Sequence, residues 1–536
     1  MPNEPGHPGV DLRAISVALA ALTAAIAIGT VAVQPQSARA LAADACTQAG
    51  TPLKFSPTIP TSFAPASSAQ QSQLVANCTA WQEFIYLNWP GAGGVPIPSP
   101  SPGQFGVAKP VWLSYNRPED FFTPPPSSAN ARFRSLYSRR NPRTGHMILS
   151  ALNEPDMLTM SGTQQAFTNG WIVAQARLNP SVPLLTFYDV WVNTDEQSYI
   201  TSNQLIYATA QQACTAGPVG LQLPRGGAND VDCQGNPHQY GLGIGAIEVK
   251  AAMIDLTGAP ADVLSRYFVL PVQFDLQYPA QLGGLKTNRT LGLTGLHIIH
   301  KMAGAQRLLW STFEHVDNDP DASGPRILGR HYTYNDPRVA ASPNVQPSCA
   351  PSGSPCNYAP TQLARESPIP SASKQTSSAA RAVMPQTTVF QNYELVNVQW
   401  PAQDVAIVPN ASTPLTTQYM QNPYVANTTM ETYIQGTPAS PQTACIECHA
   451  FAPPSTNTTA ARSPLRLMAT RGGIRKNGMV VHIRRPSANA LRAMAAGGAA
   501  SPSPQPTGGG NSDFSFIFGD LGLPGNPPSA APRRTR

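Results

Sequence analysis

Hydrophobic positions recur with helical spacing in one stretch near the start of the chain's central body. Within Gln70–Asn88, apolar or aromatic residues are separated by three or four positions, and the series is Leu74, Cys78, Trp81, Ile85 and the adjoining Trp89. This spacing is close to the 3.6 residues of one α-helical turn, so the side chains share one side of a helix. The pattern therefore predicts a helix over Gln70–Asn88.

Short apolar runs rich in aromatic and β-branched residues follow, and this composition is typical of β-strands. Four such runs predict strands, at Leu184–Val192, Ala246–Ile254, Arg266–Gln273 and Leu308–Val316. Weaker patterns indicate a strand at Val389–Trp400 and short helices at Ser202–Ala213 and Val425–Ile434. Clusters of Pro, Gly and Ser predict loops or linkers at Gly91–Pro110, Ser342–Ser378 and Pro401–Tyr424. Together these elements predict an α+β fold with a β-rich body.

An apolar segment near the N-terminus has the features of an export signal. Ile15–Val33 contains 19 uncharged residues, follows Arg13 and precedes the small-residue site Ala38-Arg39-Ala40. We therefore expect a signal peptide over residues 1–40, cleaved near Ala40, and a periplasmic or secreted protein. The alternative is an uncleaved membrane anchor, because 19 residues can just span a bilayer.

The charge of the chain is unevenly distributed. The net charge is +6, but residues 451–536 hold eleven Lys or Arg and only two acidic residues. Residues 41–450 are consequently acidic overall, so the net charge is no argument for nucleic-acid binding by the body. Residues 452–510 contain eight basic residues and no acid. We expect this stretch to be disordered; the alternative is electrostatic docking to an acidic partner or an anionic membrane surface.

The most informative motif is Cys445-Ile446-Glu447-Cys448-His449. C-x-x-C-H is the attachment motif of c-type heme. Its two thiols are spaced to add to the two heme vinyl groups, and the following histidine is held where it can ligate the iron. The alternatives are a disulfide or redox pair and a metal site, but no β-α-β pattern surrounds the motif and no second C-x-x-C exists. The motif predicts one covalent heme c at Cys445, Cys448 and His449.

Six further cysteines remain, and in an exported protein they are expected to form disulfides. Six cysteines allow fifteen pairings. Pairing of nearest neighbours in the sequence would give Cys46–Cys78, Cys214–Cys233 and Cys349–Cys356.

The second axial ligand of the iron is less clear from the sequence. Histidine candidates are His297, His300, His315 and His331, and methionine candidates are Met430, Met468, Met479 and Met494. On a strand, side chains three positions apart lie on opposite faces, so only one of His297 and His300 could then face the heme. We take His297 as the tentative distal ligand and Met430 as the alternative.

Several stretches together resemble a family of large, single-heme bacterial cytochrome c proteins that are exported and mostly uncharacterised. They are Ala80–Pro90, Gly295–Lys301, Trp310–Asn318, Ala426–Tyr433 leading into the C-x-x-C-H motif, and the closing sequence Asp513–Gly519. The resemblance implies a covalent heme at the motif, and it implies no particular reaction. Residues 452–510 depart from it, since they read as an insertion before the closing sequence.

These observations predict five segments: a signal peptide (1–40), an α+β body (41–400), a heme attachment segment (401–451), the basic stretch (452–510) and a docking motif with a tail (511–536). The expected function is electron transfer to or from a redox partner protein. The alternatives are a heme-dependent oxidoreductase of peroxidase or oxygenase type and a heme-based sensor, each with an open sixth iron position. Whether the chain is an enzyme stays open, and no catalytic residue is assigned. Trp310, Glu314 and Asp317 could belong to a pocket; the alternative is that Trp310 lies in the core and Glu314 pairs with an arginine, and none of the three is assigned a catalytic role.

Overall fold

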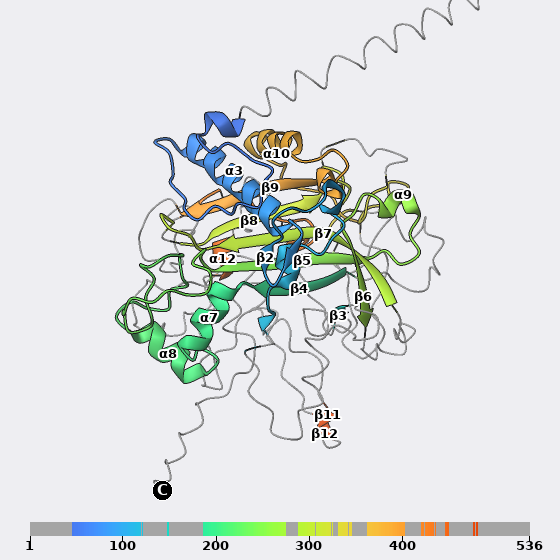
Figure 1. The fold of residues 1–536 in the computed structure, drawn as a ribbon. Coiled ribbons are helices and arrows are strands. Elements are labelled where there is room, and N and C mark those ends of the chain that lie inside the picture. Colours follow the sequence, from blue (N-terminus) through green and yellow to red (C-terminus); the bar gives the residue numbers. More distant parts are fainter. Residues whose placement is uncertain are drawn as a thin grey trace, which may run out of the picture.

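A computed structural model of the chain has a mixed α+β architecture with one large, mainly antiparallel sheet (Figure 1). The structure describes residues 45–118, 121, 147–149, 186–274, 288–305, 307–322, 324, 331–340, 342–345, 362–401, 420–422, 424–433, 435, 445–449, 475–476 and 479–480. Every structural statement below concerns these residues.

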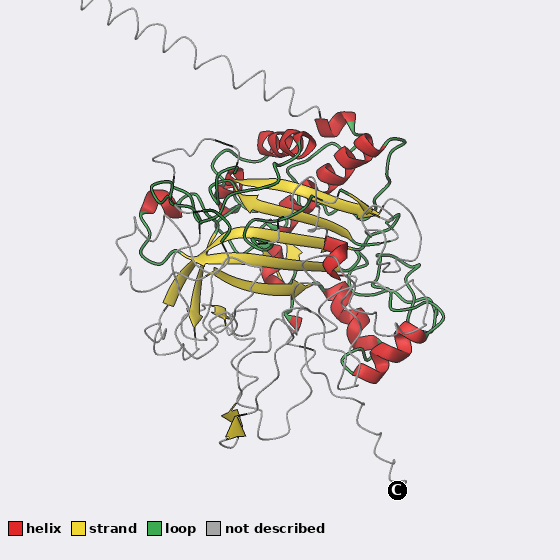
Figure 2. Cartoon of the chain, turned by 180° about the vertical axis from the view of Figure 1, so that it is seen from behind, coloured by secondary structure: helices red, strands yellow, loops and turns green. Residues whose placement is uncertain are grey.

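The sheet has eight strands, seen side by side in Figure 2. The main path runs β10-β9-β8-β7-β5-β4, while β6 pairs with β7 and β3 pairs with β6. In chain order the strands are β3 (Met147–Leu149), β4 (Thr186–Val192), β5 (Ile247–Asp255), β6 (Val269–Phe274), β7 (Asn288–His300), β8 (Leu309–His315), β9 (Tyr393–Pro401) and β10 (Met420–Gln421). All these pairings are antiparallel except the parallel pairing of β3 with β6.

Helices and short elements surround the sheet. The helices are α3 (Ala69–Leu87), α7 (Thr194–Ser202), α8 (Ala208–Ala216), α9 (Ala261–Leu264), α10 (Ser371–Val383) and α12 (Cys445–His449), with 3-10 turns η1 (Pro102–Gln104), η2 (Val111–Ser114) and η4 (Val389–Asn392). Two small hairpins are β1–β2 (Gly91–Ala92, Val95–Pro96) and β11–β12 (Arg475–Lys476, Met479–Val480). No described helix is long and apolar enough to cross a membrane.

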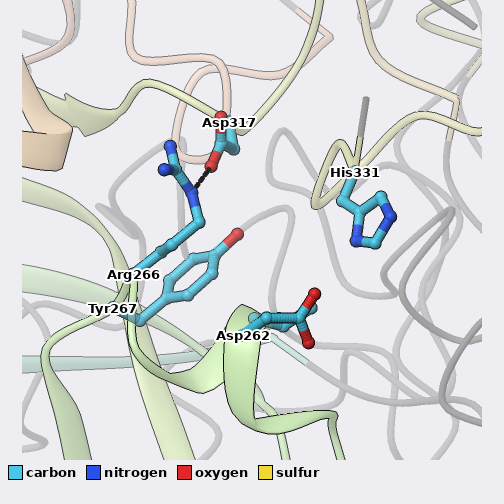
Figure 3. A pocket seen from close by; sticks show the side chains of 6 residues that line it. Asp262, Arg266, Tyr267, Asp317 and His331 are labelled. Carbon is cyan, nitrogen blue, oxygen red and sulfur yellow. Dashed lines mark hydrogen bonds and ion pairs between the residues drawn. The ribbon is translucent and has the colours of Figure 1, made fainter. Parts of the chain in front are cut away.

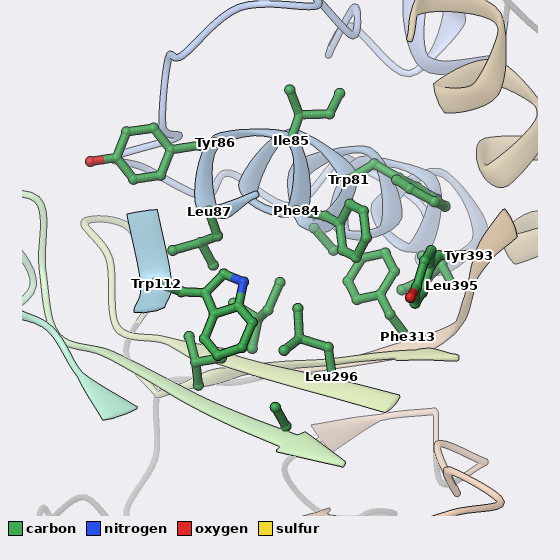
Figure 4. Packing of buried hydrophobic residues seen from close by; sticks show 14 of the residues in the cluster. Trp81, Phe84, Ile85, Tyr86, Leu87, Trp112, Leu296, Phe313, Tyr393 and Leu395 are labelled. Atoms are coloured by element: carbon green, nitrogen blue, oxygen red, sulfur yellow. The ribbon is translucent and has the colours of Figure 1, made fainter. Parts of the chain in front are cut away.

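The main hydrophobic core lies between α3 and one face of the sheet, as Figure 4 shows. Helix α3 begins after Ser68, whose hydroxyl accepts a hydrogen bond from the Gln71 backbone N–H at 3.2 Å and so caps the first turn. The fully buried ring of Phe84 packs 4.5 Å from that of Phe313 on β8 and 5.1 Å from that of Trp81. This aromatic contact fixes α3 over β8.

The side chains of strand β7 point alternately to the two faces of the sheet. Leu296 and Ile298 belong to the core under α3, and His300 points the same way, to Glu83 of α3. Ile299 belongs instead to a second cluster, together with Trp310 of β8. Side chains alternate along a strand, so His297 and Ile299 face away from α3. We call the side of the sheet away from α3 the second face.

Most of the expected elements are confirmed. The structure contains the predicted helix as α3, and the four predicted strands as β4, β5, β6 and β8. Two of the expected disulfides, Cys46–Cys78 and Cys214–Cys233, are also present. The third expected pair, Cys349–Cys356, lies outside the described residues, as do residues 1–40, most of 452–510, and 511–536.

Five expectations were wrong in detail. Val425–Ile434 forms turns and not a helix, because side chains there bind nearby backbone groups: the Glu431 carboxylate accepts from the Asn427 N–H at 2.8 Å. The expected loop Ser342–Ser378 contains the start of α10. The Val389–Trp400 strand begins with η4, and the Gly91–Pro110 loop contains the β1–β2 hairpin. The short helix expected at Ser202–Ala213 begins only at Ala208.

Helix α10 forms despite many serines because tertiary contacts outweigh their low helix propensity. Its side chains are small on the side that meets α3, and Ser373 is fully buried there. The Asn77 amide of α3 donates a hydrogen bond to the Ser373 hydroxyl at 3.3 Å.

Truncating the Phe84 ring tests this account of the core. We expect Phe84→Ala to lower the free energy of unfolding by about 3–5 kcal/mol, because it leaves a cavity among Trp81, Phe313 and Phe390. Urea denaturation with the disulfides intact measures the change. Val107→Ala is the matched control, since Val107 is 76% exposed. A loss below about 1 kcal/mol for Phe84→Ala would contradict the assignment of α3 to the core.

Candidate functional site

Helix α12, which carries the C-x-x-C-H motif, packs against the second face of the sheet (Figure 1). The backbone N–H of Ile446 donates a hydrogen bond to Oε1 of Gln399 on β9 at 3.0 Å. The Ile446 side chain is 2% exposed within the cluster that holds Ile299 and Trp310, and Cys445 packs against that cluster. The side chain of Cys448 lies outside the described part of the chain. One apolar residue and one backbone hydrogen bond thus hold the motif on the sheet.

Trp310 is the side chain that meets His449. The two ring centroids lie 4.3 Å apart with the planes at 65°, an edge-to-face contact. Trp310 itself is 3% exposed, and its indole Nε1–H is buried without an acceptor among the described residues. A buried donor without an acceptor costs about 1–3 kcal/mol, so a group with an acceptor oxygen at this position would be favoured.

His297 lies on the same face as Trp310. It pairs across the sheet with Thr312, and the neighbouring cross-strand pair is Ile299 with Trp310. The Nε2 atom of His297 is 3.5 Å from a carboxylate oxygen of Glu431, which is longer than an ordinary hydrogen bond. The imidazole is therefore held near Glu431 through a weak electrostatic contact. Of the four histidine candidates in the body, His297 is the one shown to lie on the face that receives α12.

The other three histidines are engaged elsewhere. The ring of His300 is fully buried under α3, with Nδ1 2.7 Å from Glu83 and Nε2 2.9 Å from the Ile244 carbonyl. The His315 ring stacks on Tyr267 at 3.9 Å, and its Nε2 is 3.0 Å from the Arg266 carbonyl. His331 lines a separate pocket. His297 and His300 thus lie on opposite faces of the sheet, as expected for strand positions three residues apart.

That separate pocket has a volume of about 340 Å³ and is drawn in Figure 3. Asp262, Arg266, Tyr267, Asp317 and His331 line it. Arg266 and Asp317 form an ion pair across it, and the Tyr267 hydroxyl is 2.6 Å from the Thr333 hydroxyl. The pocket lies among groups that already pair with one another, so we assign it no function.

Met430, the alternative distal ligand, is 2% exposed and packs among buried hydrophobic residues. Its loop is tied to the sheet, since the Tyr188 hydroxyl donates to the Thr429 carbonyl at 2.7 Å. Gly295 on β7 permits the approach, because a Cβ atom there would lie 2.7 Å from the Thr429 hydroxyl. The structure therefore brings the 427–431 loop onto the second face beside His297, as the Glu431 contact shows.

A buried charge network lies further along β8. The Glu314 carboxylate accepts hydrogen bonds from the Arg365 guanidinium and from the Thr428 backbone N–H and hydroxyl. Glu314 and Arg365 have side chains only 3% and 6% exposed, so the alternative in which Glu314 pairs with an arginine is confirmed. The Arg365 partner could not be found from the sequence, because it lies 51 residues away.

Asp319 lies beside this ion pair, and burial raises the pKa of its carboxyl to about 7. The Arg365 guanidinium opposes this shift, and the negative charge of Glu314 adds to it. Sequence analysis did not single out Asp319. The only signal available was its place in the acidic run Asp317-Asn318-Asp319-Pro320-Asp321.

The residues on the second face fit a covalent heme. Cys445 and His449 share one short helix, the neighbouring Trp310 offers an unused N–H donor, and His297 presents an imidazole nitrogen on the same face. Among the described residues there is no group of three His, Cys, Asp or Glu side chains that would hold a bare metal ion. Heme iron takes one or two protein ligands, the number that His449 alone or with a second residue would supply.

No protein-family model, curated protein or solved structure matches this chain.

The raised pKa of Asp319 predicts a pH-dependent stability. Between pH 4 and 7 the folded protein keeps the Asp319 proton while the unfolded chain releases it, so stability falls as the pH rises through this range. Asp319→Asn removes this dependence. We expect the stability of the variant relative to wild type to increase between pH 5 and pH 8 by on the order of 2 kcal/mol.

Urea denaturation at the two pH values measures this difference. Asp262→Asn is the control, because Asp262 is exposed, whereas the charge of Asp321 itself raises the pKa of Asp319. The prediction fails if the stability of both variants relative to wild type changes equally between pH 5 and pH 8. It also fails if Asp319→Asn is less stable relative to wild type at pH 8 than at pH 5. Either result would show that Asp319 is ionised in the folded protein throughout the range.

Proposed function

We propose that this protein is an exported c-type cytochrome with one covalent heme, and that it transfers electrons to or from a redox partner protein. The observation that carries the proposal is the C-x-x-C-H motif on a helix that packs against the sheet. Cys445 and Cys448 would form the two thioether bonds, and His449 would be the proximal iron ligand. When bound, heme supplies the one-electron redox chemistry.

The surrounding side chains would orient His449 and cover part of the motif. The Trp310 ring packs edge-to-face on the imidazole and so limits its rotation. Ile446 anchors the motif in an apolar cluster that also contains the buried Cys214–Cys233 disulfide. An apolar surrounding of this kind controls the exposure of the iron site to solvent and so its reduction potential.

His297 is the proposed distal ligand, and Met430 is the alternative. His297 is favoured because it lies on the face that receives the motif and its Nε2 is bound only weakly by Glu431. Met430 would have to leave a site where it is 2% exposed, at a cost of about 1.5–3 kcal/mol of burial energy.

The proposed location is the periplasm or the exterior, after cleavage near Ala40, with membrane anchoring as the alternative. Two disulfides in the described body support an oxidising compartment. We propose no nucleic-acid partner. The basic 452–510 stretch is proposed to make at most peripheral contact with an acidic partner or a membrane surface.

A second candidate function is a heme-dependent oxidoreductase or a heme-based sensor. The observation behind it is that His297 lies beside Glu431; if the imidazole stays there when heme is bound, the sixth iron position is open. The ferric spectrum separates the candidates: a low-spin site unaffected by cyanide supports electron transfer, and a high-spin site that binds cyanide supports the second candidate.

Covalent heme attachment is tested with the full chain exported in a host that has a c-type heme attachment system. We expect a c-type pyridine hemochrome that stays with the denatured chain, and its loss in the double variant Cys445→Ala/Cys448→Ala. Cys46→Ser/Cys78→Ser, which removes a disulfide in a separate cluster, is the matched control and should keep the heme. Wild-type protein without covalent heme would refute the proposal.

The distal ligand is tested by ferric spectra of single variants. Since removal of an axial imidazole leaves the iron five-coordinate, we expect His297→Ala to change a low-spin spectrum to a high-spin one. His331→Ala, on a different pocket, should leave the spectrum unchanged. A change in Met430→Leu together with an unchanged His297→Ala would instead assign Met430.

A further inference from the structure

Three partly exposed side chains form one row across the second face of the sheet. Val190 on β4 pairs with Lys250 on β5, and Lys250 pairs with His297 on β7. Cross-strand partners point to the same face, so Lys250 shares the second face with His297. Every other residue of β4 and β5 is buried, and so is every other residue from Leu291 to His300 on β7. We call Val190, Lys250 and His297 the partly exposed row.

The neighbouring row on the same face is buried and receives the C-x-x-C-H motif. It consists of the next cross-strand set, Val192, Glu248, Ile299 and Trp310, each at most 6% exposed. Ile446 of the motif packs in the cluster that contains Ile299 and Trp310. Since residues two positions apart along a strand are about 7 Å apart, the partly exposed row lies directly beside the place where the motif packs.

Lys250 is the one lysine or arginine in these two rows, and no described carboxylate pairs with it. Its ammonium nitrogen lies 5.8 Å from the centre of the Tyr188 ring, its one contact of this kind among the described residues. The Glu431 carboxylate, on the loop beside this row, is engaged by the Asn427 N–H and the His297 ring. Partial burial of an unpaired charge is unfavourable, so an anionic group beside Lys250 would be stabilising.

The proposed heme would bring anionic groups to this place. Every heme carries two propionate side chains, which are carboxylates at neutral pH. His297, the proposed distal ligand, is the direct cross-strand neighbour of Lys250, and the Cβ atoms of such neighbours are about 4.5–5.5 Å apart. A lysine side chain is long and flexible and ends in three N–H donors, so it can reach a carboxylate at the edge of a group that His297 contacts.

We propose that the Lys250 ammonium binds a heme propionate and so helps to set the reduction potential of the iron. This inference rests on the proposed heme function and adds a residue that the C-x-x-C-H motif does not indicate. A hydrogen bond between an ammonium and a carboxylate is about twice as strong as a neutral one. The ferric form carries one more positive charge than the ferrous form, so a nearby ammonium disfavours the ferric form. Lys250 therefore raises the reduction potential.

Redox titration of the heme-loaded full chain tests the proposal. Lys250→Met keeps a side chain of similar length and removes the charge. We expect it to shift the reduction equilibrium at least tenfold toward the ferric form, which lowers the one-electron potential by about 59 mV or more. Lys250→Arg keeps the charge and should stay within about threefold of wild type.

Lys374→Met is the matched control, because it removes the same charge from an exposed position on α10. Its reduction equilibrium should also stay within about threefold of wild type, since solvent and salt screen distant exposed charges. A shift below about threefold in Lys250→Met would overturn the proposal, and so would a potential of Lys250→Arg as low as that of Lys250→Met.

The resonance Raman spectrum of the ferric protein separates a propionate contact from a general effect of charge. The bending band of the heme propionates responds to hydrogen bonding of their carboxylates. We expect this band to shift in Lys250→Met and to keep its wild-type position in Lys374→Met. Lys250→Gln is the second neutral variant if Lys250→Met is not exported with heme. A lowered potential with an unshifted propionate band would show that Lys250 touches no propionate, and would refute the contact.

The inference and the proposed function fail in different experiments. A wild-type chain without covalent heme refutes the proposed function, and this inference with it. A wild-type chain with covalent heme whose potential and propionate band do not depend on Lys250 refutes the inference alone.

Discussion

The packing of α3 on one face of the antiparallel sheet determines where every candidate functional group lies. The contact of Phe84 with Phe313 fixes the side of β8 that faces the helix. Because side chains alternate along a strand, the same contact sends Trp310 to the opposite face, and on β7 it separates His300 from His297. A shift of one residue in strand pairing would exchange the two histidines and bury Trp310 under α3.

The second face differs from the first in chemistry as well as in position. The α3 side is filled mainly by aromatic and aliphatic side chains, together with the His300–Glu83 pair, whereas the second face carries His297, Thr312 and Glu314. A polar loop covers it, tied down by the Tyr188 hydroxyl and by Glu431. This face has both an apolar patch that receives the C-x-x-C-H motif and ionisable groups beside it. We infer that the large body of the protein serves to build and shield this face.

The sequence was sufficient for the features that depend on local pattern. Periodicity located α3 and four strands, and sequence proximity paired Cys46 with Cys78 and Cys214 with Cys233. The motif at Cys445 was visible because its chemistry requires a fixed spacing. The coarse α+β class followed from the same local signals.

Features that depend on distant contacts could not be predicted. Helix α10 is serine-rich and is held by α3, nearly 300 residues earlier in the chain. The expected helix around Asn427 forms turns instead, because the Asn427 and Glu431 side chains accept hydrogen bonds from nearby backbone N–H groups. Asp319 lies near Glu314, Arg365 and Thr428, which come from three other segments, so the acidic run in the sequence gave no indication of its raised pKa.

The central claim is that the cysteines of α12 carry a covalent heme. Peptide mapping by mass spectrometry of the exported, non-reduced protein tests it most directly. The account predicts a single peptide containing Cys445–His449 whose mass includes one heme, with both cysteines modified. An unmodified peptide, or one in which Cys445 and Cys448 form a disulfide, would contradict it.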